Sequence, residues 1–384
     1  MRSFFLLICI TMLAGTAFAE VPTESIGKVE VLPLPYPNGL IIAADFSMNH
    51  PAEGRLVFLD INGKTQPEQF RGLLNISLIG FLTIGKERDE LYVAETFYSR
   101  GRRGDRTDVV TIYDKSTLQP IDEIVIPSKR FLGVPNRHNM ELDESGRYLL
   151  VFNLTPATSV SVIDVIDRKF IGEIDTPGCS FIFPTGRAGF SSICADGSMM
   201  SIQLNPQGLV ASRETTESFF DVETDPLFAE AALVDNFGYF PTFGGDIQEV
   251  DLSDSIAKPG LKWPLTQSDG SDSGWRPGGL QLIDSDSKGN IYVLMHPRGD
   301  SSSHKDGGKE VWIFDRESRK RISKLELQTW SISLSVVGEA GSEYLVTSNV
   351  RKNLDVYDLQ TLEYVKSMER FAQDTPLIIV YNPH

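Results

Sequence analysis

Few residues of this chain have the spacing that a catalytic or metal-binding motif requires. None of its five histidines has the helical or Cys-x-x-Cys-like spacing of a metal site; they are His50, His138, His296, His304 and His384. The hydrolase motif Gly-x-Ser-x-Gly is absent, and the many Asp and Glu residues single out no acid–base pair. The sequence therefore predicts no catalytic residue and no metal site on this chain, although several histidines could still meet in space.

Two cysteines are candidates for a disulfide. Cys9 lies in the N-terminal apolar run, which leaves Cys179 and Cys194 as an even pair. In an oxidising compartment such a pair favours one disulfide, and two buried free thiols are the alternative. If it forms, we expect it to join two neighbouring repeat units and to stabilise the fold by about 3 kcal/mol.

Trp275 and Arg276 lie in the segment Gly274-Trp275-Arg276-Pro277-Gly278-Gly279, whose glycines and proline favour an irregular loop. A large aromatic ring and a guanidinium held in a loop are typical of an interface anchor. A packed crossing between repeats is the alternative. Both residues are therefore candidates for an interface with a partner.

A basic cluster stands out on an otherwise acidic chain. Arg100, Arg102, Arg103 and Arg106 lie in one Gly-containing loop, whereas the formal net charge of the chain is −16. The acidic balance argues against nucleic acid as a partner. The cluster indicates a solvated loop or an ion-pair site for another protein.

The elements that position these residues are expected to be β-strands. Short β-rich runs that end in a polar or acidic residue recur seven times, at Leu56–Asp60, Val110–Asp114, Val160–Asp164, Met200–Leu204, Ile247–Asp251, Val311–Asp315 and Leu354–Asp358. Another strand-like run precedes each, most units add an outer alternating segment, and helical periodicity is nearly absent. The terminal Asp residues are expected to hydrogen-bond the following turns.

Radial packing of repeated four-stranded units buries both faces of each unit. We therefore predict an all-β chain that forms a seven-bladed β-propeller of four-stranded antiparallel blades. The run Leu377–Tyr381 lies beyond the last unit. It is expected to pair with the strand near Leu40, so that N- and C-terminal strands close the ring of one domain spanning residues 20–384.

The N-terminus has the pattern of a secretory signal. Arg2 precedes the apolar run Phe4–Ala14, and Ala17-Phe18-Ala19 offers a cleavage site. The run is shorter than the ~20 apolar residues that a membrane span needs. We therefore expect residues 1–19 to be removed after Ala19 and the mature chain to be exported and soluble, with no membrane partner.

Several longer segments resemble, in order, the heavy subunits of the amine dehydrogenases that depend on tryptophan tryptophylquinone. They include Thr96–Asp114, Pro156–Asp164, Gly189–Arg213, Trp275–Gly279 and Tyr292–Asp315. The sequence looks most similar to the heavy chain of aromatic amine dehydrogenase and more distantly similar to that of methylamine dehydrogenase. The resemblance covers most of the mature chain.

This resemblance implies a periplasmic assembly of two heavy and two light subunits. The small, disulfide-rich light subunit would carry the quinone and the catalytic aspartate, and the heavy chain would carry no cofactor. The assembly would oxidise a primary amine to an aldehyde and ammonia, and a cupredoxin or cytochrome c would accept the electrons. The resemblance also implies a disulfide between Cys179 and Cys194.

In that family a bulky side chain from the first repeat gates the substrate channel. The segment Phe46-Ser47-Met48-Asn49-His50 occupies the corresponding stretch. His50 is the main candidate for the gate, with Asn49, Met48 and Phe46 beside it, and a solvated loop histidine is the alternative. Because this stretch departs from both family branches, it does not indicate which amine is oxidised.

Two other functions are compatible with a propeller. A stand-alone hydrolase or lactonase with a metal on the central axis would need inward-pointing carboxylates and histidines at equivalent positions of several blades. A non-catalytic propeller could instead only bind proteins.

Overall fold

The computed structural model describes residues 31–46, 53–86, 88–267, 269–374 and 376–381. It separates Met1–Val31 from a compact unit, Leu32–His384, and the following description concerns that unit. Its described residues form 28 strands, one short α-helix and two 3-10 helices. None of these helices is long and apolar enough to span a membrane.

The first three sheets have four antiparallel strands each. The first contains β28 (Pro376–Tyr381), β1 (Leu40–Phe46), β2 (Glu53–Asp60) and β3 (Phe70–Ser77), with α1 (Gln66–Gln69) between β2 and β3. The second contains β4 (Phe81–Ile84), β5 (Glu90–Tyr98), β6 (Arg106–Asp114) and β7 (Pro120–Ile126). After a 3-10 turn (Arg137–Asn139), the third contains β8 (Met140–Leu142), β9 (Tyr148–Asn153), β10 (Ser159–Asp164) and β11 (Lys169–Asp175).

Two further four-stranded sheets follow, and then one larger sheet. The fourth contains β12 (Cys179–Pro184), β13 (Gly189–Cys194), β14 (Met199–Leu204) and β15 (Val210–Thr215), and the fifth β16 (Ala232–Val234), β17 (Phe237–Pro241), β18 (Asp246–Asp251) and β19 (Lys258–Pro264). The last contains β20 (Arg276–Pro277), β21 (Ile283–Ser285), β22 (Ile291–His296), β23 (Gly308–Asp315), β24 (Lys320–Val337), β25 (Tyr344–Asn349), β26 (Leu354–Asp358) and β27 (Glu363–Met368), with a 3-10 turn at Ser303–Lys305.

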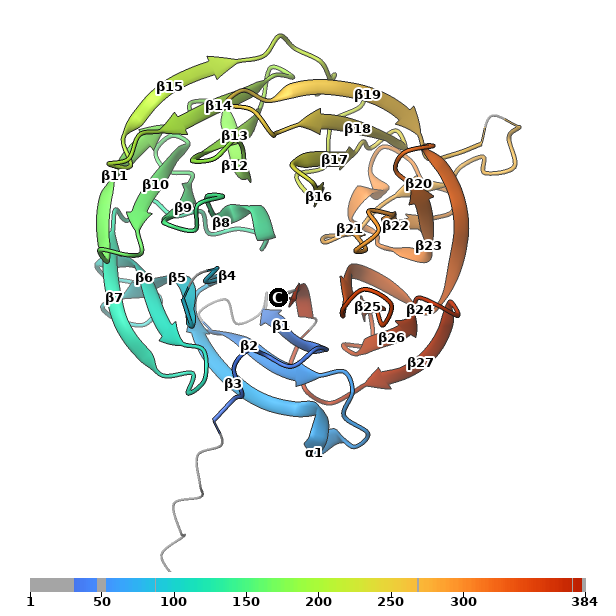
Figure 1. Ribbon diagram of the computed structural model, residues 1–384, viewed down its shortest axis with the longest axis horizontal. Coiled ribbons are helices and arrows are strands. Elements are labelled where there is room, and N and C mark those ends of the chain that lie inside the picture. The colour runs from blue at the N-terminus through green and yellow to red at the C-terminus, as the bar shows by residue number, and fades with distance from the viewer. Residues whose placement is uncertain (1–30, 47–52, 87, 268, 375, 382–384) are drawn as a thin grey trace, which may run out of the picture. The chain divides into compact units, whose positions relative to one another are not determined.

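The sheets surround a common axis as a β-propeller (Figure 1). Strands β4, β8, β12, β16 and β21 face the centre, and β3, β7, β11, β15, β19 and β27 form the rim. Apolar clusters fill the space between neighbouring sheets: one joins the first sheet to the second, and another joins β26 to β1. The core is therefore a ring of inter-sheet contacts, as the predicted radial packing requires.

The Asp residues that end the repeat strands shape the turns, as predicted. The Asp164 carboxylate accepts hydrogen bonds from the backbone N–H groups of Ile166 and Asp167, at 3.0 and 2.9 Å. Asp114 and Asp358 accept the equivalent pairs of bonds. This local bonding explains why a strand can end at the same residue type in unit after unit.

The predicted seven-bladed arrangement is wrong, because five sheets are four-stranded and the remaining one has eight strands. The last two repeat units share β24, which runs unbroken for 18 residues. Its first half pairs with β23, where Trp312 faces Lys324, and its second half pairs with β25, where Leu334 faces Thr347. This strand contains neither Gly nor Pro, so no residue within it forces the break that separate blades need.

Pairing between the chain ends closes the ring, as predicted. The last strand, β28, pairs antiparallel with β1, and Ile41 faces Tyr381. The side chains of Leu377, Ile378 and Ile379 are buried in the clusters on either side of the first sheet. The C-terminal strand is thus the innermost strand of the first sheet.

The predicted disulfide between Cys179 and Cys194 is confirmed. The two residues face each other on β12 and β13, which belong to the same sheet. The expectation that the bond joins neighbouring units is therefore wrong. Cys179 was expected to follow the outer strand of the preceding unit, but it begins β12, the inner strand of the sheet that also contains Cys194.

Replacing both cysteines with serine should lower the free energy of unfolding by about 3 kcal/mol, because the bond closes a short loop in the unfolded chain. Denaturant titration measures this change. Ser192→Ala, on β13 with Cys194, is the control. It should lower the free energy of unfolding by about 1 kcal/mol, because it removes the hydrogen bond that the Ser192 hydroxyl donates to the Phe181 carbonyl at 2.7 Å. Equal midpoints for the double variant and the wild type would contradict a stabilising disulfide.

Candidate functional site

Phe46, the first of the predicted channel residues, ends β1 and is 5% exposed. Its ring packs close to Gly54: a Cβ added at Gly54 would lie 3.0 Å from the ring and 3.1 Å from Ile76. Met48, Asn49 and His50 lie outside the described residues. The structure therefore describes only Phe46 among the predicted channel residues, and the channel role of all four stays a prediction.

A small cavity of about 20 Å³ lies beside Phe46. Its walls come from the ends of β1, β4 and β28 and from the segment that follows β7, and they are mostly apolar: Ala44, Phe46, Gly80, Phe81, Leu82, Pro135, Asn136, Arg137, Ile378 and Val380. Arg137 is the one charged side chain among them. This residue connects the Phe46 region to the propeller axis.

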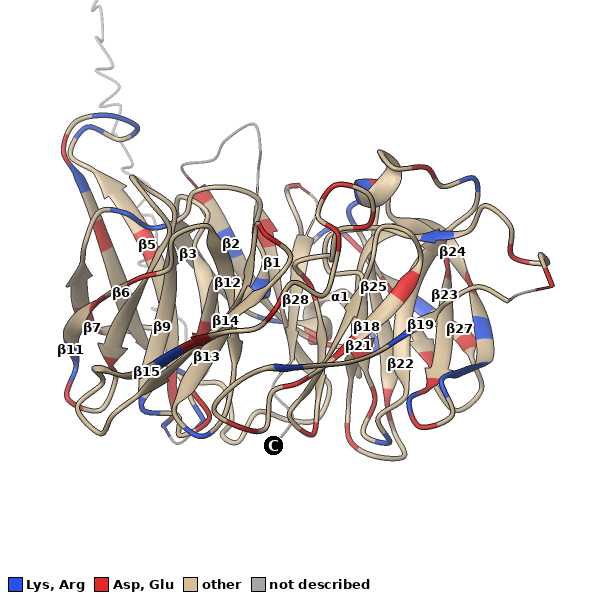
Figure 2. Cartoon of the chain, turned by 90° about the horizontal axis from the view of Figure 1, so that it is seen from above, with Lys and Arg blue, Asp and Glu red and all other residues tan. Residues whose placement is uncertain are grey.

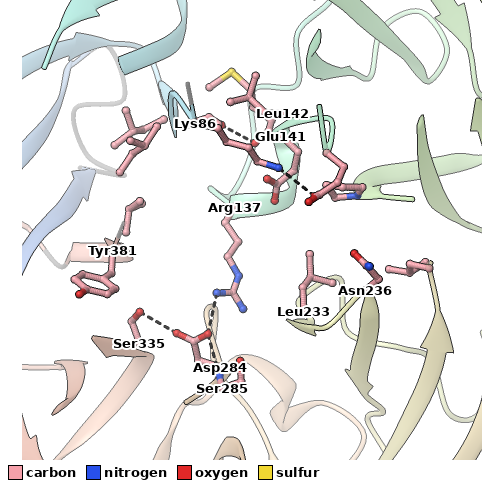
Figure 3. Close-up of a pocket in the computed structure, with 18 of the residues that line it drawn as sticks. Lys86, Arg137, Glu141, Leu142, Leu233, Asn236, Asp284, Ser285, Ser335 and Tyr381 are labelled. Carbon is pink, nitrogen blue, oxygen red and sulfur yellow. Dashed lines mark hydrogen bonds and ion pairs between the residues drawn. The ribbon is translucent and has the colours of Figure 1, made fainter. Parts of the chain in front are cut away.

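Arg137 reaches across the axis and joins distant parts of the ring (Figure 3). Its guanidinium is 3.0 Å from the Glu230 carboxylate and 3.6 Å from that of Asp284. It also donates hydrogen bonds of 2.8 Å to the carbonyls of Ala231 and Ile283. One side chain thus ties the segment before β8 to β16 and β21.

Burial lowers the pKa of the Arg137 guanidinium, but the nearby Glu230 and Asp284 carboxylates outweigh this effect, so the net pKa is raised. Glu230 is 3% exposed, and its Oε1 is buried without a hydrogen-bond partner. Burial raises the pKa of Glu230, and the nearby Arg137 guanidinium only partly offsets this effect. The charged form of Glu230 therefore depends on Arg137 for compensation.

A cavity with a volume of about 710 Å³ lies on the axis. It is lined by the inner strands β4, β8, β12, β16, β21, β24 and β28, and Arg137 contributes to its wall as well as to that of the small cavity. The polar groups inside are largely paired: Asp284 accepts from Ser335 at 2.9 Å, and Lys86 lies 3.2 Å from Glu144. The wall of this axial cavity therefore carries hydrogen-bonded and ion-paired side chains.

The described histidines do not come together as a metal site. His138 contacts the Glu141 carboxylate at 3.0 Å, and His296 contacts the Ser303 hydroxyl at 2.8 Å. His304 stacks on Phe243, with ring centroids 4.3 Å apart. Within the described ranges, no three His, Cys, Asp or Glu side chains are grouped to hold a metal ion.

The predicted interface residues Trp275 and Arg276 are half-buried. The Trp275 ring packs on Trp312 at 5.3 Å, and the Arg276 guanidinium donates to the Phe243 carbonyl at 3.1 Å. Trp275 packs against the core between the fifth and last sheets. These contacts fit a packed crossing between sheets, and a role in an interface stays a prediction.

Asp272 precedes Trp275 in the same loop and anchors that loop through a cluster of ion pairs. Its carboxylate is 3% exposed and lies 2.6 Å from Arg321 and 2.9 Å from Lys324. Both cations sit over the Trp312 ring, at 4.3 and 4.2 Å from its centroid. Burial raises the pKa of Asp272, but hydrogen bonds from the two cations outweigh it and lower the pKa to about 2.

This depressed pKa predicts a pH-dependent contribution to stability. The contribution, about 2 kcal/mol, should be complete above the unfolded-state pKa of ~3.9 and be lost as the pH falls towards 2. Asp272→Asn should remove it at neutral pH and flatten the acid limb of the stability curve. Denaturant midpoints from pH 7 to 2.5 test this, with the exposed Asp254→Asn as control; parallel curves for wild type and Asp272→Asn would disprove it.

Comparison with known proteins gives the family. The model of the methylamine dehydrogenase heavy chain family matches residues 56–382. This chain belongs to that family. It is therefore related to the heavy subunits of amine dehydrogenases. The expectation that it is more similar to the heavy chain of aromatic amine dehydrogenase stays a prediction.

Curated relatives agree with this family assignment. The methylamine dehydrogenase heavy chain of Methylorubrum extorquens is 29% identical over 291 residues, which cover 74% of this chain and 70% of the relative. That of Methylophilus methylotrophus is 27% identical over 325 residues, covering 83% and 78%.

Solved structures show the fold alone. A putative 6-phosphogluconolactonase from Bacteroides fragilis superposes with a TM-score of 0.59 at 11% identity, over 93% of this chain and 99% of that one. A dihydro-heme d1 dehydrogenase superposes with a TM-score of 0.54 at 14% identity, over 88% of this chain and 64% of that one.

Sequence reasoning missed Arg137 and its partners. Glu230 lies 93 positions away, and Ile283, whose carbonyl also accepts from Arg137, lies 146 away. No local pattern joins residues so far apart. The one available signal was the polar run Asn136-Arg137-His138-Asn139 between two apolar segments, because a polar run entering an apolar core needs partners there.

Proposed function

We propose that this chain is the non-catalytic heavy subunit of a periplasmic amine dehydrogenase that depends on tryptophan tryptophylquinone. The observation that carries the proposal is the family match over residues 56–382. A small, disulfide-rich light subunit would carry the quinone, which supplies the oxidation of a primary amine to an aldehyde and ammonia. Two heavy and two light subunits would assemble, and a cupredoxin or cytochrome c would take the electrons.

In this assembly the heavy chain would be a scaffold and would line the substrate channel. The proposed channel stretch begins at Phe46, whose buried ring borders a small, mostly apolar cavity. An apolar wall suits the carbon chain of an amine and excludes water from the reacting centre. Export through a signal at residues 1–19 is consistent with the Cys179–Cys194 bond, because disulfides persist in oxidising compartments.

Purification of the chain from its native host tests the proposal. We expect a small, disulfide-rich subunit with quinone absorbance to co-purify, and the complex to reduce a redox dye when a primary amine is added. A colourless single chain that hydrolyses a lactone would refute the proposal. The likeness to a putative lactonase, at 11% identity, gives that alternative no support beyond the fold.

Within this assembly, His50→Ala should change the apparent KM or the order of preference among amines. The expected reason is that a smaller side chain widens the channel without touching the chemistry on the partner. Steady-state kinetics with a short aliphatic and an aromatic amine measure the change. Lys64→Ala is the control, because Lys64 is exposed and follows Asp60, at the end of β2 opposite to Phe46. Unchanged KM and preference would remove His50 from the channel.

A further inference from the structure

The hairpin between β5 and β6 extends beyond its own sheet. Strand β4 pairs with β5 no further than Ala94, and β7 pairs with β6 no further than Asp108. The β5–β6 ladder nevertheless continues to the pair Tyr98 and Arg106. Residues 97–107, here called the arm, therefore project as a two-stranded ribbon, which Figure 2 shows standing above β5 and β6 with basic residues at its tip.

The tip of the arm is ordered by its own hydrogen bonds. Ser99 N–H donates to the Asp105 carbonyl at 3.0 Å, and Arg100 N–H donates to the Arg103 carbonyl at 2.9 Å. Gly104 has a φ of 99°, and a Cβ there would lie 2.3 Å from the Ser99 hydroxyl oxygen. The turn therefore favours glycine at this position, and its hydrogen bonds order the backbone that carries the neighbouring arginines.

The base of the arm is anchored in the core. The Arg106 guanidinium binds the fully buried Asp108 carboxylate at 2.7 and 2.8 Å and donates to the Arg130 carbonyl at 2.8 Å. A free two-stranded ribbon is only marginally stable in water. This anchoring gives the arm a fixed direction and reduces the ordering cost of binding a partner.

The arm presents positive charge that the rest of the molecule does not neutralise. Arg100, Arg102 and Arg103 are exposed, and none forms an ion pair with a carboxylate of the described residues, although the chain has a net charge of −16. Phe97, at the base, is 44% exposed. Arginine and aromatic side chains are enriched in protein interfaces, so the arm suits a carboxylate-rich protein surface.

The arm rises on the face where Phe46 lies. Phe81 begins β4 opposite Ala94, and β5 continues past this point into the arm. Phe81 also shares the small cavity with Phe46. At the end of the preceding strand, Ser77 N–H donates to the Glu95 carboxylate at 2.7 Å. A partner seated over the end of β1 would therefore meet the arm one sheet further along the ring.

We propose that the arm is an electrostatic docking element for the small partner subunit, and that its three tip arginines bind a carboxylate-rich patch on that subunit. This inference rests on the proposed function. The partner is that subunit because the proposed channel has to open towards it, on the face that carries Phe46. The charges act mainly on the rate of encounter and on its salt dependence.

The test uses the full-length heavy chain and the small subunit co-purified from the native host. The triple variant Arg100→Gln, Arg102→Gln, Arg103→Gln removes the tip charges and keeps the turn glycines. The matched control, Lys64→Gln, Lys288→Gln, Lys320→Gln, removes three exposed charges from two turns and from the start of β24, on the opposite face. Dissociation constants are measured at low and high salt, and melting temperatures confirm that both variants are folded.

At low salt the arm variant should bind the small subunit about tenfold more weakly than the wild type, with a reduced salt dependence, while the control stays within about twofold. If the wild-type chain binds the small subunit and the arm variant binds it with the same affinity and salt dependence, the docking role of the arm is wrong, and the proposed function is unaffected. A wild-type chain that binds no small subunit at either salt would overturn the proposed function and this inference together.

Discussion

Deletion of residues 376–384 should leave the propeller open and lower its free energy of unfolding by about 5 kcal/mol or more. The deletion removes β28 and with it Leu377, Ile378 and Ile379, all of which are buried. Each such side chain contributes about 1.5–3 kcal/mol through burial. The deletion also removes the mutual hydrogen bonds between Gln281 and the Ile379 backbone, both 2.9 Å, and leaves the edge of β1 unpaired.

Thermal unfolding and the soluble yield measure this effect. Deletion of residues 382–384 alone is the matched control, because it shortens the same terminus without removing any residue of β28, and it should leave both quantities unchanged. A soluble 376–384 deletion variant with the wild-type melting temperature would show that pairing of the chain ends does not stabilise the ring.

Arg137→Met should lower the free energy of unfolding by about 3–5 kcal/mol, because it leaves the buried Glu230 carboxylate without its cation. Arg137 also supplies hydrogen bonds to two buried carbonyls, those of Ala231 and Ile283. Denaturant titration gives the change. Lys258→Met, which breaks the exposed ion pair with Asp254, is the control and should cost less than about 1 kcal/mol.

The double variant Arg137→Met, Glu230→Gln separates the lost ion pair from lost packing. Removing the buried charge together with its partner should recover much of the stability, since a neutral amide costs far less to bury than an unpaired carboxylate. If the double variant is as unstable as Arg137→Met alone, the Glu230 charge is not the cause.

The sequence predicted those features that repeat locally. Strand alternation recurs in each unit and a terminal aspartate in six of the seven. Leu377–Tyr381 could be recognised as a spare strand because it lay beyond the last unit. The cysteine pair was also recognisable, but its place was not: the short strand β12 precedes the part of the unit that repeats clearly, so Cys179 was assigned to the wrong sheet.

The features that the sequence did not predict depend on distant contacts or on a missing signal. The repeat pattern placed the last two repeats in separate blades, and β24 contains no Gly or Pro that would have marked where such a break falls or fails to fall. The axial ion pair of Arg137 joins residues far apart in the chain, and the fold alone brings them together. For the channel stretch, the structure adds only the position of Phe46.

The shared strand β24 also affects how the protein opens. In a propeller of separate sheets, each sheet can fluctuate open while its neighbours remain closed. Here β23 and β25 are hydrogen-bonded to the two halves of one backbone segment, so the opening of one half withdraws support from the other. We therefore expect the two units joined by β24 to unfold locally as one cooperative unit and their amide hydrogens to exchange with solvent together.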